Sequence, residues 1–195
     1  MARFPVMGEI AHAVADFLAA QMKHDGVKAE VSDSLPDAPA KSARVHFVMF
    51  DARQNLDRRE TEAISEQERK KDGTVIDYLR DPPIFLDLSF LMFADGPLPG
   101  AHAALAKAAL LIKDHPVLDD LPSLSELYVA RDESLALRLM HAYEAEEIAA
   151  IMHRMGVAAR PALVYSCSAR IESDKRREVK RVEERILDIR KKENS

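Results

Sequence analysis

The sequence predicts an α+β domain: a central mixed or antiparallel sheet with about three packed helices, a protruding polar hairpin and a charged C-terminal arm. Three observations support this fold class. Apolar residues recur at three- and four-residue steps in three segments, which is typical of amphipathic helices. Three apolar runs of roughly ten residues alternate between two faces, as strands do. Hydrophobic residues make up 47% of the 195 positions, enough to bury a core.

Three segments have helical periodicity. The first, residues 6–24, ends just before a glycine, the usual residue after a helix C-terminus. The second, residues 101–114, is rich in alanine and stops before a proline. The third, residues 143–155, has acidic residues in its first turns and basic residues in its last, which suits the helix dipole. The apolar stripes of the first and third are Ile10, Val14, Phe17, Leu18 and Met22, and Ile148, Ile151, Met152 and Met155.

Four segments are the main strand candidates, and residues 127–130 and 135–140 are further short β-prone runs. Residues 44–52, 84–93 and 161–172 are long, and residues 27–31 are a shorter candidate. Apolar side chains occur on both faces of the first two long strands, which predicts a sheet that is covered on both sides. The sets that share a face within each strand are Val45, Phe47 and Met49, with Val48 and Phe50 opposite; Ile84, Leu86, Leu88, Phe90 and Met92; and Leu163, Tyr165, Cys167, Ala169 and Ile171.

The polar stretch 55–81 separates the first two long strands. Asp72-Gly73 is a turn signal, and residues 74–79 after it are β-prone. A long exposed hairpin is therefore expected here, with a short helix at 61–71 as the alternative. Either structure would project from the domain with a charged surface and little core of its own.

The C-terminal segment, residues 174–195, differs in charge from the domain of residues 1–173. Arg170 to Glu193 contains ten Lys or Arg and seven Asp or Glu, a local charge of +3 (10 − 7) against −5 for the chain. Its apolar residues recur at helical spacing, but so thin a stripe makes a marginal helix by itself. We expect a helix or an extended arm that contacts a neighbouring subunit. The candidate interface residues are Arg176, Arg177, Val179, Lys180, Val182, Arg185, Ile186 and Ile189.

Composition argues against several partners. The net charge is −5, and acidic residues interrupt the basic run at 175–181, which disfavours a nucleic-acid surface. No segment approaches the roughly 20 apolar residues that span a bilayer, and the N-terminus lacks the apolar run of a signal peptide. A single cysteine favours a reducing compartment. We therefore expect a cytoplasmic protein with neither nucleic acid nor membrane as a partner.

The sequence contains no motif for catalysis or cofactor binding. Its six glycines are scattered, without a phosphate-binding loop. Glu146 and His153 share a helix face, but the further ligands of a metal site are missing, so a solvated face is expected. Cys167 alternates with apolar residues, which predicts a core position. His46 is expected at the edge of the core rather than as a ligand. These features predict no enzyme activity and no cofactor.

Five segments carry a family resemblance: residues 44–55, 82–93, 114–118, 143–148 and 160–165. The Pro-Pro strand and the His-Pro-Val-Leu element are the most specific of them. In this order, after an N-terminal amphipathic helix, they resemble the N-terminal domain of the cap, or tail-terminator, proteins of extracellular contractile injection systems. The resemblance covers roughly residues 5–172, and none of its segments is a catalytic signature.

The resemblance implies a structural role. Proteins of this family form a hexameric ring on the distal end of the inner tube, contact the last sheath layer and end polymerisation. They are not enzymes and need no cofactor. The expected partners are therefore further copies of the chain and the tube and sheath proteins. Some members carry an additional C-terminal domain where this sequence has a short charged arm, which leaves the type of cap open.

Two other functions are compatible with the residues alone. The first is an assembly adaptor or chaperone that binds one partner through its C-terminal arm; it should be monomeric or dimeric, whereas a cap should form six-fold rings. The second is a small enzyme whose residues converge only in the fold. A pocket lined by His, Asp and Glu would favour the enzyme.

Overall fold

The computed structural model divides the chain into two compact units. One comprises Met1–Glu60 and Pro83–Glu172, and the other comprises Thr61–Pro82 and Ser173–Ser195. The residues described are 5–58, 62–71, 73, 75–118, 135–136, 138–139, 143–171 and 176–179.

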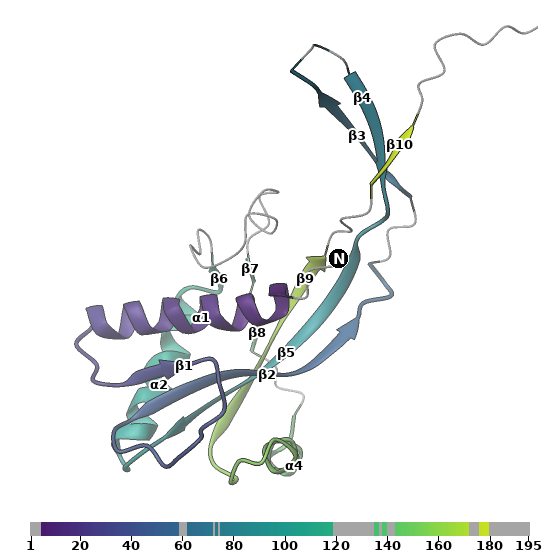
Figure 1. Cartoon of the computed structure of the whole chain (residues 1–195). Coiled ribbons are helices and arrows are strands. Elements are labelled where there is room, and N and C mark those ends of the chain that lie inside the picture. The colour runs from purple at the N-terminus through teal and green to yellow at the C-terminus, as the bar shows by residue number, and fades with distance from the viewer. Residues whose placement is uncertain are drawn as a thin grey trace, which may run out of the picture. The chain divides into compact units, whose positions relative to one another are not determined.

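The first unit is built on a five-stranded sheet with the strand order β1-β2-β5-β9-β8 (Figure 1). Its strands are β1 (Glu30–Ser32), β2 (Arg44–Gln54), β5 (Ile84–Asp95), β9 (Ala162–Ile171) and β8 (Arg138–Leu139). β1 runs parallel to β2 and the other neighbours are antiparallel, so the sheet is mixed. The three long strands predicted from the sequence form its centre.

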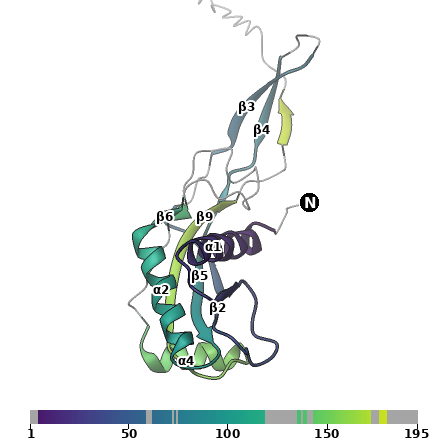
Figure 2. The same ribbon diagram turned by 90° about the vertical axis from the view of Figure 1, so that its left-hand side faces the viewer.

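Three helices of the described residues pack on this sheet: α1 (Pro5–His24), α2 (Gly100–Asp114) and α4 (Ala145–Arg154). Figures 1 and 2 show α1 and α2 on one face of the sheet and α4 on the opposite face. The three predicted helices are confirmed, and the predicted α+β class with them. No helix among the described residues combines the length and the apolar character needed to cross a membrane.

The larger core lies between the sheet and helices α1 and α2. Ile10, Leu18 and Met22 of α1 are fully buried in it. Burial of each such side chain stabilises the fold by roughly 1.5–3 kcal/mol. The strand residues that pack there are those predicted to share a face, including Val45, Phe47, Leu88, Phe90, Met92, Tyr165, Cys167 and Ala169.

The smaller core lies on the opposite face, beneath α4. Its buried members are Val48, Leu91, Phe93, Ile151, Met152, Val157 and Val164. The backbone N–H of Glu144 donates to Glu147 Oε2 at 2.9 Å, which fixes the start of α4. α4 has 10 residues and β5 has 12, which correspond to lengths of about 15 Å and about 40 Å. The helix is therefore too short to cover this face of the sheet.

A β-bulge interrupts the pairing of β2 with β5. The register shifts between Met49 and Asp51, which makes Phe50 the extra residue of β2. Beyond the bulge Asp51 pairs with Ser89, which lies on the same face of β5 as Leu91. Asp51 therefore follows Phe50 onto the α4 side, whereas unbroken alternation would point it toward the larger core.

Two buried polar residues hold the loop of residues 33–43. The Nδ1 atom of His46 is 2.7 Å from the carbonyl oxygen of Ser34, and the His46 side chain is 1% exposed. Asp95 Oδ1 accepts a hydrogen bond from the backbone N–H of Ala40 at 3.3 Å. His46 is thus part of the packed interior and satisfies a loop carbonyl there.

The described part of the second unit is a three-stranded sheet with the order β10-β4-β3. Its strands are β3 (Ile64–Arg69), β4 (Val75–Arg80) and β10 (Arg176–Val179). The predicted hairpin is confirmed, and the alternative of a helix at 61–71 is wrong. Gly73 adopts a φ of 88° near the turn, in the left-handed region that glycine tolerates best. Every described residue of this unit is exposed or half-buried, which agrees with the prediction of little core.

Two very short strands complete the described elements. β6 (Val117–Leu118) pairs with β7 (Leu135–Ala136) in an antiparallel ladder. Leu118 is buried and belongs to the larger core, so β6 packs against the rest of the first unit.

Candidate interaction surfaces

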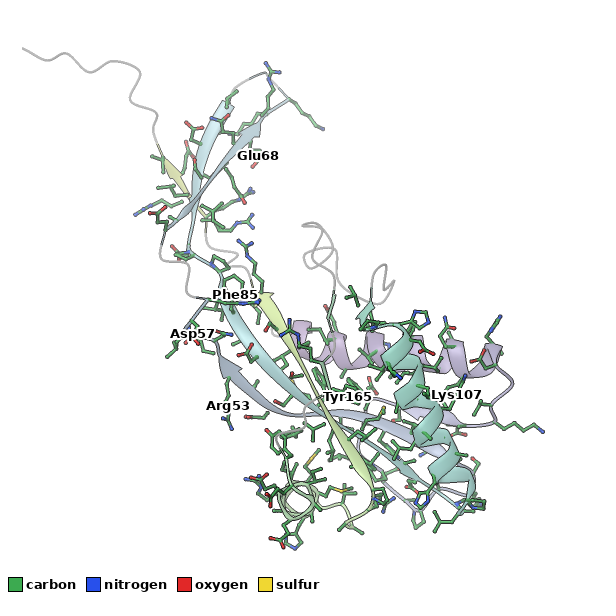
Figure 3. The ribbon with its side chains drawn as sticks, turned by 180° about the vertical axis from the view of Figure 1, so that it is seen from behind. Arg53, Asp57, Glu68, Phe85, Lys107 and Tyr165 are labelled. Carbon is green, nitrogen blue, oxygen red and sulfur yellow. The ribbon has the colours of Figure 1, made fainter. Side chains whose placement is uncertain are left out.

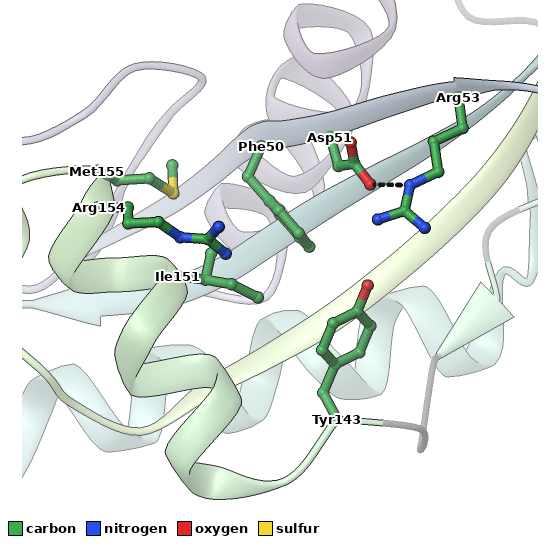
Figure 4. Close-up of a pocket in the computed structure, with 7 residues that line it drawn as sticks. All are labelled: Phe50, Asp51, Arg53, Tyr143, Ile151, Arg154 and Met155. Carbon is green, nitrogen blue, oxygen red and sulfur yellow. Dashed lines mark ion pairs between the residues drawn. The ribbon is translucent and has the colours of Figure 1, made fainter.

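A hollow of about 380 Å³ lies beside α4, on the face of the sheet that α4 covers only in part (Figure 4). Its lining residues are Phe50, Asp51, Arg53, Tyr143, Ile151, Arg154 and Met155. The apolar and aromatic members are buried or half-buried, whereas the two arginines are exposed. The hollow therefore has an apolar floor and a charged rim.

Local structure explains how these side chains meet. The bulge turns both Phe50 and Asp51 toward the hollow, and the ring of Phe50 meets that of Tyr143 edge-on at 6.1 Å. On α4, Ile151 and Arg154 are three residues apart and so share a face of the helix. In Figure 4 the guanidinium groups of Arg53 and Arg154 reach in from opposite sides of Phe50.

The charges of the hollow do not balance. Arg53 Nε lies 2.7 Å from Asp51 Oδ2, so these two form an ion pair. Arg154 has no hydrogen bond or ion pair with any residue that the structure describes. One positive charge is left over next to an apolar floor, a combination that suits an apolar side chain adjacent to a carboxylate.

The chain after β2 forms a fixed turn around Asn55. The side-chain Oδ1 of Asn55 accepts hydrogen bonds from the backbone N–H groups of Asp57 and Arg58 at 3.0 and 3.1 Å. An asparagine that bonds its own following backbone is a common turn device. The turn displays Leu56 with 68% of the residue exposed, which is as high as any large apolar residue in the described part of the chain.

Asp87 joins this turn to the sheet. Its two carboxylate oxygens accept hydrogen bonds from Asn55 Nδ2 at 2.9 Å and from Ser168 Oγ at 2.7 Å. The backbone N–H of Asn55 also donates to the carbonyl oxygen of Phe85 at 2.8 Å. Figure 3 shows Asp57 and Phe85 at the same end of the main sheet, away from α4. The exposed Leu56 is therefore held on a rigid support.

The small sheet of the second unit contains three of the candidate interface residues. Arg176, Arg177 and Val179 lie on β10, which pairs with β4 of the same chain. Arg176 forms an ion pair with Glu68 at 3.1 Å and lies 4.8 Å from the centre of the Tyr78 ring. The other candidates, Lys180, Val182, Arg185, Ile186 and Ile189, lie outside the described residues.

Groups that could perform chemistry are buried or dispersed in the described structure. Burial raises the pKa of Cys167 to about 12, and burial likewise raises the pKa of Tyr165 to about 12. The predicted core position of Cys167 is confirmed. Glu146 and His153 are exposed on α4. Within the described ranges, no group of three or more His, Cys, Asp and Glu side chains could hold a metal ion.

Neither the hollow beside α4 nor the turn at Asn55 was predicted from the sequence. A bulge has no dependable sequence signal, so the shared orientation of Phe50 and Asp51 could not be inferred. The turn did have a signal, because Asn55 follows the polar end of a strand whose first part is apolar, and it precedes a leucine and an aspartate. Its partner Asp87 lies 32 residues away, which local patterns do not reveal.

Comparison with known proteins gives two similar solved structures. One is the PVC sheath/tube terminator of an extracellular contractile injection system in the extended state, with a TM-score of 0.61 and 13% identity, covering 92% of this chain and 62% of that chain. The other is the tube-terminating cap of the anti-feeding prophage, with a TM-score of 0.58 and 16% identity, covering 88% of this chain and 59% of that chain. This chain thus spans about three fifths of the length of each, and the likeness shows a shared fold.

The comparison of sequences is more specific than that of folds. No curated protein matches the chain. Residues 9–185 match the family described as the Pvc16 N-terminal domain, which is most of the 195 residues. The resemblance to cap proteins of contractile injection systems is confirmed: the chain belongs to the Pvc16 N-terminal domain family.

Proposed function

We propose that this protein is a structural cap subunit that forms a hexameric ring at the distal end of the inner tube and sheath of a contractile injection system. Bound there, the ring ends polymerisation. The observation that carries the proposal is the fold shared over 92% and 88% of the chain with two proteins that terminate such tubes. The role is non-catalytic, and the subunits are made in the cytoplasm and assembled into the particle.

The described surfaces suit a ring subunit. A ring of identical copies needs two different complementary patches on each subunit. The first unit has an apolar hollow beside Arg154, which pairs with no other residue among those described, and, separately, an exposed leucine on a fixed turn. The second unit has a small sheet with exposed charged residues. We propose that the C-terminal segment, with Arg176, Arg177 and Val179 of β10, adds to contacts with neighbouring subunits or with the sheath.

The first test is the mass of the purified full chain in solution, by light scattering after size exclusion, followed by negative-stain imaging. A mass near six times the 21.8 kDa of the chain, with six-fold rings, supports the proposal. A monomer or dimer that binds a single partner protein would instead favour an assembly adaptor.

The second test concerns termination. The inner tube protein of the same injection system is polymerised with increasing amounts of this protein, and tube lengths are measured by electron microscopy. A cap should shorten the tubes in a concentration-dependent manner and occupy one end only. Tubes of unchanged length, with no density at either end, would contradict the proposal even if rings form in solution.

A further inference from the structure

The first observation concerns the exposure of Leu56, on the turn that follows β2. Leu56 and Leu98 are the most exposed of the large apolar residues described, each at 68%. Leu56 is directly followed by the exposed Asp57, whereas Leu98 stands between two prolines. The turn that displays Leu56 is held by Asn55 and Asp87, so docking would cost little conformational entropy.

The hollow beside α4 has the complementary chemistry. Phe50, Ile151 and Met155 offer an apolar floor, and Arg154 offers a guanidinium without a partner among the described residues. A volume of about 380 Å³ leaves ample room for one leucine side chain. A leucine followed by a carboxylate is complementary to this surface, because the leucine would contact the apolar floor and the carboxylate would pair with Arg154.

Leu56 of one copy cannot reach the hollow of the same copy. Phe50 and Leu56 are six residues apart along and just beyond the extended strand β2, a separation of up to about 20 Å at 3.3 Å per residue. The hydrogen bonds of β2 to β5 and of Asn55 to Asp87 prevent the strand from folding back. A Leu56 side chain that fills the hollow must therefore come from another molecule.

We propose that the occupant is a second copy of this chain. Leu56 of one copy inserts into the hollow lined by Phe50, Ile151 and Met155 of the next copy, and Asp57 pairs with Arg154 across the contact. Because the two patches differ, the contact is head-to-tail and propagates around a ring rather than stopping at a two-fold dimer. The inference rests on the proposed ring and specifies the contact that would build it.

Charge reversal in the full chain tests the pairing. Asp57→Arg and Arg154→Asp should each weaken self-association at least about tenfold, because each places like charges together. Combining both changes in one chain should restore most of the loss. Leu56→Ala should also weaken association about tenfold. Leu98→Ala, which alters an equally exposed leucine outside the contact, is the matched control and should leave association unchanged. Association is measured by sedimentation velocity over a range of concentrations.

Cysteine cross-linking tests the geometry. One preparation carries Leu56→Cys and a second carries Met155→Cys. The native Cys167 is buried and contributes little background. Under mild oxidation, a disulfide-linked dimer should form when the two preparations are mixed. Much less of this dimer should form in either preparation alone. A chain with both substitutions should give a ladder of linked species.

These experiments separate the contact from the proposed function. Rings that form normally in the charge-reversed and Leu56→Ala variants, without mixed cross-links, would overturn the contact while leaving the cap function intact. A wild-type protein that does not self-associate, together with cysteine variants that give no mixed cross-link, also overturns the contact, and the tube-length assay then decides the cap function independently. Mixed cross-links together with rescue by the double reversal support the contact whatever that assay shows.

Discussion

His46 Nε2 lies 4.0 Å from Asp95 Oδ2, and the two side chains are only 1% and 9% exposed. Within the described structure Nε2 has no hydrogen-bond partner, while Nδ1 is bonded to the carbonyl oxygen of Ser34. Burial is the main cause that lowers the pKa of His46 below its ordinary value of 6.5. The Ser34 bond and Asp95 act in the opposite direction, and the charges of Arg44 and Arg160 reinforce the lowering.

The lowered pKa predicts a loss of stability in acid. Between the folded pKa and 6.5 the unfolded chain binds more protons, so the free energy of unfolding falls as the pH drops through 6.5 and levels off below the folded pKa. Urea denaturation at about pH 7.5 and about pH 5.5 should show this fall. His46→Gln should reduce the pH dependence, whereas His153→Gln, at an exposed position, should keep it. An equal pH dependence in wild type and His46→Gln would contradict the assignment.

Gly96 is expected to tolerate no side chain. Its φ is +113°, and an added Cβ would lie 2.4 Å from the backbone oxygen of Ser42. Gly96→Ala should therefore lower the free energy of unfolding by about 2–4 kcal/mol, through strain and displacement of the loop. Gly8→Ala is the matched control, since a Cβ on that helical glycine meets nothing within 4 Å. The control should stabilise the protein by roughly 0.5–1 kcal/mol. Denaturation midpoints measure both.

Asn55→Ala should uncouple the turn from the sheet. It removes the acceptor for two backbone N–H groups and the donor to Asp87, at a cost of about 1–2 kcal/mol in unfolding free energy. Since Leu56 would lose its fixed position, the free energy of self-association should fall by more than the free energy of unfolding does. Gln54→Ala, at an exposed neighbour, should change neither property. Calorimetry and sedimentation velocity on the same samples separate the two effects.

Cys167 should be unreactive in the folded protein. Its thiol is buried, and burial raises its pKa to about 12, so almost no thiolate exists at neutral pH. A thiol reagent at about pH 8 should label the folded protein at least ~100-fold more slowly than the protein in denaturant. Fast labelling of the folded protein would show that β9 is accessible from the α1 side, contrary to the packing described.

Removal of residues 174–195 should leave the first unit folded. That unit contains none of these residues, whereas β10 belongs to the second unit. We expect a cooperative unfolding transition close to that of the full chain and a smaller fraction of rings by light scattering. A truncated protein that unfolds outright, or that forms rings as well as the full chain, would count against a role of the C-terminal segment in assembly.

Much of the fold was determined by the sequence itself. The periodic apolar residues of α1 and α4 and the alternating residues of β5 and β9 placed nearly every buried side chain on its correct face, because burial follows the repeat of each element. Cys167 could be assigned to the core for the same reason. The family resemblance likewise depended on the order of local segments.

The tertiary structure alone decided the surfaces that we propose for assembly. The bulge at Phe50 shifts the alternation of side chains between the two faces of β2, and no local sequence pattern predicts it. The bond from Asn55 to Asp87 and the pairing of β10 with β4 join residues far apart in the sequence. Such contacts depend on how whole elements pack, whereas periodicity reports only which face of each element is buried.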